Sequence, residues 1–170
     1  MTIDNFDRFK NIQTEEFTSS DTWTRPSGID YVYVEACAGG GGGSRNNSVG
    51  INEGGQKGSS FSGWVNVAGN LSITIGAAGV GASSDSDGGN GGNTVFGTTT
   101  LIGGTGGDND NDSAAKRGDT LELFGGQGGK SNSTAGDNAS GYGCGGGASS
   151  SAGYDGGDGS AGFVRITWNN

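Results

Sequence analysis

The sequence predicts an all-β protein in which glycine-rich segments pack together as ordered polyglycine-II helices. Glycine occupies 40 of the 170 positions, far above the usual share of about 7%. Leu, Ile, Val and Phe together supply only 27 residues, fewer than the roughly 20% that an ordinary hydrophobic core requires. Short stretches with strict period-two alternation separate the glycine runs, and such alternation is typical of strands.

Helical and collagen-like folds are excluded by the same composition. Each glycine in a helix interior costs about 1 kcal/mol relative to alanine, and glycine recurs throughout the chain after residue 30. A collagen helix needs glycine at every third position with abundant proline, but Pro26 is the only proline. A disordered low-complexity chain is the remaining alternative, and the regular strand pattern argues against it.

Residues 1–16 differ from the rest of the chain because they contain no glycine. Four large apolar residues recur there at near-helical spacing: Ile3, Phe6, Phe9 and Ile12. A segment this short cannot bury such a stripe by itself. We therefore expect an N-terminal anchor that docks on another protein, with a disordered arm as the alternative, followed by one glycine-rich domain over residues 17–170.

The strand-like runs begin at Phe17 and are expected to form seven or eight strands. Residues 29–38 alternate most clearly: Tyr31, Tyr33 and Glu35 share one face, and Val32, Val34 and Ala36 share the other. Residues 61–76 read as a hairpin that turns at Ala68-Gly69-Asn70, with Phe61, Val65 and Val67 on one face before the turn and Leu71, Ile73 and Ile75 after it. Further strands are expected within residues 17–28, 93–104, 119–124 and 162–168.

Seven glycine runs separate or follow these strands: residues 38–44, 76–82, 87–93, 103–108, 125–129, 141–149 and 153–162. Their Gly-Gly-X spacing suits an extended helix with three residues per turn and a rise of about 3.1 Å per residue. Without Cβ atoms, neighbouring helices approach until backbone N–H and C=O groups bond between them. The hydrogen bonds of such a bundle stabilise the fold in place of a hydrophobic core, whereas flexible Gly/Ser linkers would contribute no stabilising contacts.

The charge and the residue types exclude several classes of function. Nine Lys and Arg against 18 Asp and Glu give a net charge of −9, which disfavours nucleic acid as a partner. The absence of histidine removes the commonest general base and metal ligand, so we expect no enzyme and no cofactor. No apolar run approaches the ~20 residues of a membrane span, and the start of the sequence lacks signal-peptide features.

Two further patterns are candidate sites. Cys37 and Cys144 either form one bridge or are two small buried thiols, and the second interpretation is favoured. Residues 108–112 alternate acidic and amide side chains like a calcium loop. However, its sixth position is Ser113 rather than glycine and its twelfth is Asp119 rather than glutamate, so a mobile acidic loop is favoured and no metal site is predicted.

Polar loops between the glycine runs carry the candidate recognition residues. Residues 44–60, 108–118 and 130–142 are rich in Asn, Asp, Ser and Thr, which supply adaptable hydrogen bonds on a stiff frame. The candidate receptor-binding residues are Arg45, Asn46, Asn47, Asn109, Asn111, Lys116, Arg117, Asn132 and Tyr142. The alternative is that these loops only connect the glycine segments.

Residues 17–44 combine a Phe-Thr…Trp-x-x-Pro-x-Gly strand, a hydrophobic strand and a glycine run. This opening resembles the glycine-rich domain common in phage tail-fibre and tail-tip proteins, and the segments 71–81, 88–107 and 155–168 look like its remaining parts. The arrangement is also similar to the glycine-rich domain of anaplastic lymphoma kinase receptors, where a tumour-necrosis-factor-like β-sandwich carries glycine helices. A more distant similarity is to the tail-fibre adhesins of T-even phages.

The resemblance implies a jelly-roll or tumour-necrosis-factor-like β-sandwich beside the glycine bundle, assembled as a homo-oligomer, with a trimer as the guess. It also implies a non-enzymatic virion protein at a fibre or tail tip, made in the host cytoplasm. Residues 1–16 would dock on other virion proteins, and the polar loops would bind a host glycan or outer-membrane protein. The alternative is a capsid decoration or head-fibre protein that binds only the virion; an ice-binding protein is a weaker one.

Overall fold

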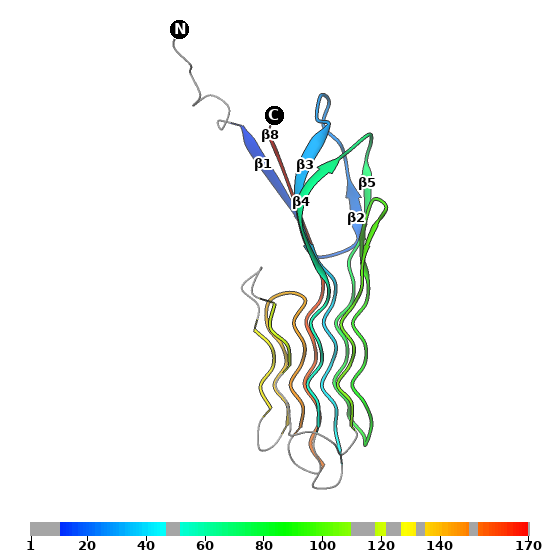
Figure 1. Ribbon diagram of the computed structural model, residues 1–170, viewed down its shortest axis with the longest axis vertical. Coiled ribbons are helices and arrows are strands. Elements are labelled where there is room, and N and C mark those ends of the chain that lie inside the picture. Colours follow the sequence, from blue (N-terminus) through cyan, green and yellow to red (C-terminus); the bar gives the residue numbers. More distant parts are fainter. Residues whose placement is uncertain are drawn as a thin grey trace.

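The computed structural model describes residues 11–46, 52–109, 118–121, 127–131, 135–149 and 153–169. These residues form eight strands in two antiparallel four-stranded sheets, with no helix among them, and so the described chain holds no helix that could cross a bilayer. Figure 1 shows the sheets at one end of an elongated molecule and a bundle of wavy, side-by-side segments extending from them. The all-β prediction is confirmed.

Each sheet combines strands that lie far apart in the sequence. The first sheet has the order β1 (Ile12–Phe17), β8 (Phe163–Asn169), β3 (Tyr31–Cys37) and β4 (Ser60–Asn66). The second has the order β2 (Asp21–Trp23), β5 (Leu71–Thr74), β6 (Thr94–Phe96) and β7 (Thr99–Leu101). Among the described residues, the first and last strands are therefore neighbours, paired from Ile12↔Asn169 to Phe17↔Val164.

The expected hairpin over residues 61–76 is wrong. β4 pairs with β3 in the first sheet, whereas β5 pairs with β2 and β6 in the second, so the turn at residues 68–70 crosses between sheets. Both strands place an apolar face on the same core from opposite sides, and alternation alone does not distinguish such a corner from a hairpin. The strands expected within residues 93–104 are formed as β6 and β7, which pair as a hairpin that turns at Gly97, whose φ is +57°.

Two other expectations about elements differ from the structure. β1 begins at Ile12, so the first sheet starts before the domain boundary expected at residue 17, and Ile12 belongs to a strand rather than to a helical stripe. Ile3, Phe6 and Phe9 lie outside the described residues. The strand expected over 119–124 is not formed over residues 119–121, and residues 122–124 lie outside the described residues.

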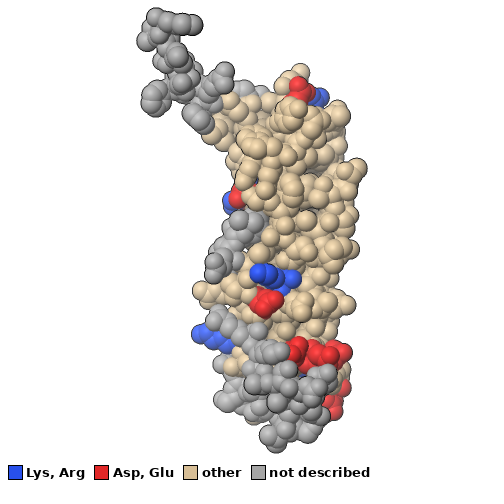
Figure 2. All heavy atoms as spheres, in the orientation of Figure 1, with Lys and Arg blue, Asp and Glu red and all other residues tan. Residues whose placement is uncertain are grey.

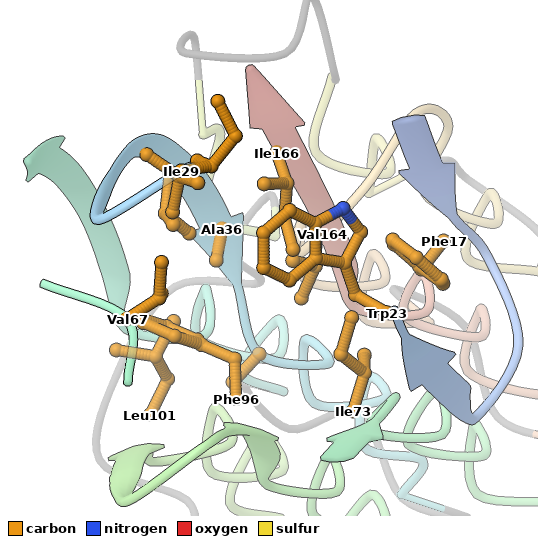
Figure 3. Packing of buried hydrophobic residues seen from close by; sticks show 13 residues of the cluster. Phe17, Trp23, Ile29, Ala36, Val67, Ile73, Phe96, Leu101, Val164 and Ile166 are labelled. Atoms are coloured by element: carbon orange, nitrogen blue, oxygen red, sulfur yellow. The ribbon is translucent and has the colours of Figure 1, made fainter. Parts of the chain in front are cut away.

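The hydrophobic core lies between the two sheets (Figure 3). Val32, Val34 and Ala36 point into it, whereas Tyr31 is exposed on the other face of β3, as the alternation predicts. The fully buried residues of the core cluster with the largest side chains are Trp23, Phe96, Ile73, Ile166, Val32, Val34, Val67 and Val164. Trp23 of the second sheet meets Trp168 of the first edge-on, with ring centroids 5.5 Å apart.

The glycine segments continue the strands into a hydrogen-bonded array. Residues 38–45 extend β3 and lie at the centre of this array. Their successive N–H groups donate in rotation to three neighbouring segments, at 2.8–3.1 Å. The donor–acceptor pairs are Ala38–Ser59, Gly41–Gln56 and Ser44–Glu53; Gly39–Gly92, Gly42–Gly89 and Arg45–Ser86; and Gly40–Ser160 and Gly43–Gly157. Every third residue therefore donates to the same neighbouring segment, and each of these three segments runs antiparallel to residues 38–45.

The carbonyl groups of the same central segment follow the same rotation. They accept hydrogen bonds of 2.8–3.2 Å from three further segments, all parallel to it. The donor–acceptor pairs are Gly104–Gly39 and Gly107–Gly42; Gly79–Gly40 and Ala82–Gly43; and Gly146–Gly41 and Ser149–Ser44. The central segment is thus surrounded by six neighbours, and its buried peptide groups find partners without any side chain.

Steric contact explains why the central segment is glycine. A Cβ atom at any position from Gly39 to Gly43 would overlap a backbone carbonyl oxygen of a neighbouring segment, a different one at each position. For Gly41 the overlapped oxygen belongs to Thr105, and for Gly40 to Cys144. Close approach of the backbones, and not flexibility, therefore sets the composition of this segment.

Amide exchange should detect this array directly. We expect the N–H groups of Gly39–Gly43 to exchange as slowly as those of β3, because both are buried and hydrogen-bonded and open only with global unfolding. The exposed turn residues Ala68 and Gly69 serve as the fast-exchanging reference. Exchange of the central glycines at the rate of that turn, measured by NMR, would rule out the ordered array.

Candidate functional site

The loops at the end of the array remote from the two sheets form the candidate site, which we call the tip (Figure 1). Its described parts are residues 45–46, 83–87, 108–109 and 153–155. They follow or precede array segments, so the backbone hydrogen bonds of those segments hold them at fixed positions. Figure 2 shows acidic side chains gathered at this end, and Asp85, Asp87 and Asp108 are exposed there.

Arg45, a predicted recognition residue, ties two tip loops together. Its Nη1 donates to the Ser83 carbonyl at 2.5 Å and to Asp155 Oδ1 at 2.6 Å. Its backbone pairs in both directions with Ser86 at 3.1 Å. Only 16% of the side chain is exposed, so Arg45 chiefly positions the loops around it.

Asparagine side chains join the same loops. Asn46 is buried, and its Nδ2 donates to the Asn109 carbonyl at 3.0 Å. The Asn109 backbone N–H donates to Asp87 Oδ1 at 3.0 Å. Three predicted residues, Arg45, Asn46 and Asn109, are therefore brought together at the tip.

Tyr142 lies elsewhere. Its ring stacks on Phe163 at the start of β8, with centroids 4.6 Å apart and planes 20° apart. It belongs to a second apolar cluster with Cys37, Leu121 and Cys144, at the junction of the array with the first sheet. The remaining predicted residues, Asn47, Asn111, Lys116, Arg117 and Asn132, lie outside the described residues.

Tyr154 is a tip residue that the sequence analysis did not single out. It is 48% exposed, beside Asp155 and next to Gly153, whose φ is +84°. Its one sequence signal is an aromatic residue inside the last glycine run, a signal that Tyr142 shares. Within the described residues, no group of three or more acidic or cysteine side chains is arranged to hold a metal ion, and most of the acidic loop 108–112 falls outside them.

The two cysteines are free and buried, as the favoured interpretation predicts. Cys144 Sγ accepts a hydrogen bond from the Leu121 N–H at 3.2 Å. Burial raises the pKa of the Cys37 thiol to about 12 and also raises the pKa of Cys144. Neither thiol is therefore a reactive nucleophile at neutral pH, and both act as small apolar side chains.

This pKa predicts a loss of stability at alkaline pH. In the unfolded chain the Cys37 thiol ionises near its ordinary pKa of 9.0, and in the folded protein only near 12. The unfolded state therefore releases its proton first, so this contribution to stability is complete below pH 9 and declines between pH 9 and 12. Urea unfolding across this range should show a shallower decline for Cys37→Ala; equal slopes would contradict the assignment.

The sequence matches the family model described as a glycine-rich domain over residues 14–141, which runs from β1 through β7 and most of the array. A search of curated proteins returns no match.

Proposed function

The chain belongs to the glycine-rich domain family, and we propose that it is a non-enzymatic phage virion protein at a fibre or tail tip. In this proposal the tip binds a host-surface glycan or outer-membrane protein, and the opposite end docks on other virion proteins. The resemblance of residues 17–44 to tail-fibre domains supports the phage assignment.

The proposal includes a finer account of the fold. The glycine segments are polyglycine-II helices, because each N–H and C=O direction of residues 38–45 repeats after three residues, the repeat of that helix. The two sheets are the sandwich of a jelly-roll or tumour-necrosis-factor-like domain, because they pack face to face over one apolar core. Homotrimers are expected by analogy with that class.

One observation carries the functional proposal: the protein has two distinct ends. β1 and β8, the first and last strands, lie together in the first sheet, and the polar loops lie at the far end of the array (Figure 1). The hydrogen-bonded array between them is a stiff spacer. Such a molecule presents adaptable loops on a rigid scaffold while its other end is attached.

Adsorption to cells tests the proposal. The fluorescently labelled full chain is applied to a panel of bacterial strains that includes the phage host. We expect saturable binding to the host and competition with phage adsorption. Joint replacement of Asn111, Lys116, Arg117 and Tyr154 by alanine should weaken both effects at least tenfold.

The matched control is Ile102→Ser, which changes an exposed side chain beside β7, away from the tip. This variant should bind like the wild type. No binding to any strain at saturating protein would reject the receptor-binding role. Binding to emptied capsids alone, lost on deletion of residues 1–10, would instead establish the decoration alternative. The deletion ends at residue 10 so that β1 stays intact.

A further inference from the structure

The outer face of the first sheet carries a row of side chains that crosses all four strands. Strand register places Thr14, Thr167, Tyr33 and Trp64 side by side in β1, β8, β3 and β4. Cross-strand partners share a face, so the row runs from hydroxyl groups to an aromatic pair. With strands about 4.8 Å apart, it is roughly 14 Å long, comparable to a short oligosaccharide.

Trp64 is the most exposed large apolar residue of this face. It is 70% exposed on β4, an edge strand of its sheet. Tyr33 holds it by an edge contact, with ring centroids 5.5 Å apart and planes 71° apart. The Tyr33 hydroxyl shares a 2.7 Å hydrogen bond with Ser62 Oγ, so the aromatic pair is fixed before any ligand arrives.

Polar and aromatic groups flank this row on both sides. One flanking row contains Glu16, Arg165, Glu35 and Ser62, in which Arg165 contacts Glu16 at 2.8 Å and Glu35 at 3.4 Å. On the other side Tyr31, 62% exposed, pairs with Asn66 of β4. Hydrogen-bonding groups therefore surround an exposed aromatic ring.

We propose that this face binds a carbohydrate, with a pyranose ring stacked on Trp64 and its hydroxyl groups bonded to the flanking polar side chains. The C–H bonds on a pyranose face are weakly positive and the face of an aromatic ring is negative, so the two attract. This site is separate from the tip and does not depend on the proposed function.

Two other kinds of partner fit this face less well. Nucleic-acid bases also stack on aromatic rings, but the net charge of −9 repels their phosphates. A second copy of the chain would have to cover the carboxylates of Glu16 and Glu35, which lie on this face with Arg165 between them. Because glutamate is depleted in protein–protein interfaces, the face suits a second copy less well than it suits a sugar.

Tryptophan fluorescence tests the proposal. Trp23 is fully buried and Trp168 is partly buried against it, so the emission of Trp64 responds most to a surface ligand. The full chain is titrated with cellohexaose, chitohexaose and maltohexaose, whose rings present C–H faces. We expect at least one of them to shift the emission to shorter wavelength with saturation in the millimolar range.

Calorimetry should show that Trp64→Ala no longer binds the sugar that shifts the wild-type emission. Trp64→Phe should retain part of the binding. Tyr154→Ala, at the tip, is the matched control and should bind normally; circular dichroism confirms that each variant is folded. The proposal is overturned if none of the three sugars binds at a concentration about 20-fold above the expected millimolar dissociation constant. It is also overturned if Trp64→Ala binds the sugar as well as the wild type does. It is equally overturned if Trp64→Ala changes only self-association in sedimentation.

Discussion

Gly41→Val is expected to abolish folding. A Cβ at this position would overlap the Thr105 carbonyl oxygen, and only separation of the backbones relieves the overlap. That separation breaks the bonds from the Gly41 N–H to the Gln56 carbonyl and from the Gly146 N–H to the Gly41 carbonyl, both 2.9 Å. Each buried group left unpaired costs about 1–3 kcal/mol, and total stability is typically only 5–15 kcal/mol.

Soluble yield and urea unfolding measure this effect. Gly146→Val should behave in the same way, because its Cβ would overlap the Gly157 carbonyl oxygen. The matched control is Gly69→Ala, since a Cβ there meets nothing within 4 Å, and its unfolding midpoint should stay near that of the wild type. A Gly41→Val protein with the wild-type midpoint would be incompatible with the close packing of the array.

The strands and their faces could be predicted from sequence because alternation has a direct physical cause. In β3 each second residue is apolar, and the faces follow from the pleat. Strand partners could not be predicted in the same way. β4 and β5 alternate equally well, and only the shared core, in which Val67 and Ile73 are both buried, shows that they face each other across two sheets.

Composition predicts that the glycine segments are ordered, but not which segment is central. Any glycine segment offers the same N–H and C=O groups, so the choice of neighbours depends on where the adjoining strands start. Residues 38–45 take the central position because they continue β3, an inner strand of its sheet. The one local trace of this position is that residues 39–43 are consecutive glycines, as a segment with close neighbours on every side requires.

The candidate site was predictable only as a set of polar loops. Asparagines that build loops and asparagines that face solvent look alike in sequence, and Asn46 proves to be buried. Tyr142 and Tyr154 both stand in glycine runs, yet the first stacks on Phe163 and the second is exposed at the tip. Their difference follows from the end of the array at which each run turns.

Trp23→Ala is the second change with a large expected effect, a loss of about 3–5 kcal/mol in the free energy of unfolding. Trp23 is fully buried and meets Trp168 of the opposite sheet, so its removal leaves a cavity between the sheets. Its indole N–H has no partner, and Trp23→Phe, which removes that donor, should cost less. Trp64→Ala on the exposed face is the control and should cost only about 0.5–1.5 kcal/mol, the loss of its edge contact with Tyr33.

Amide exchange in Trp23→Ala would also show whether the sheets and the array unfold together. The array segments continue strands of both sheets, as residues 38–45 continue β3 and residues 102–109 continue β7. Loosening the core should therefore release the ends of the array. We expect protection of Gly41 and of Val34 to fall by the same factor, because one cooperative unit has one opening free energy. If Gly41 kept its full protection while Val34 lost it, the array would be a unit that is stable by its backbone hydrogen bonds alone.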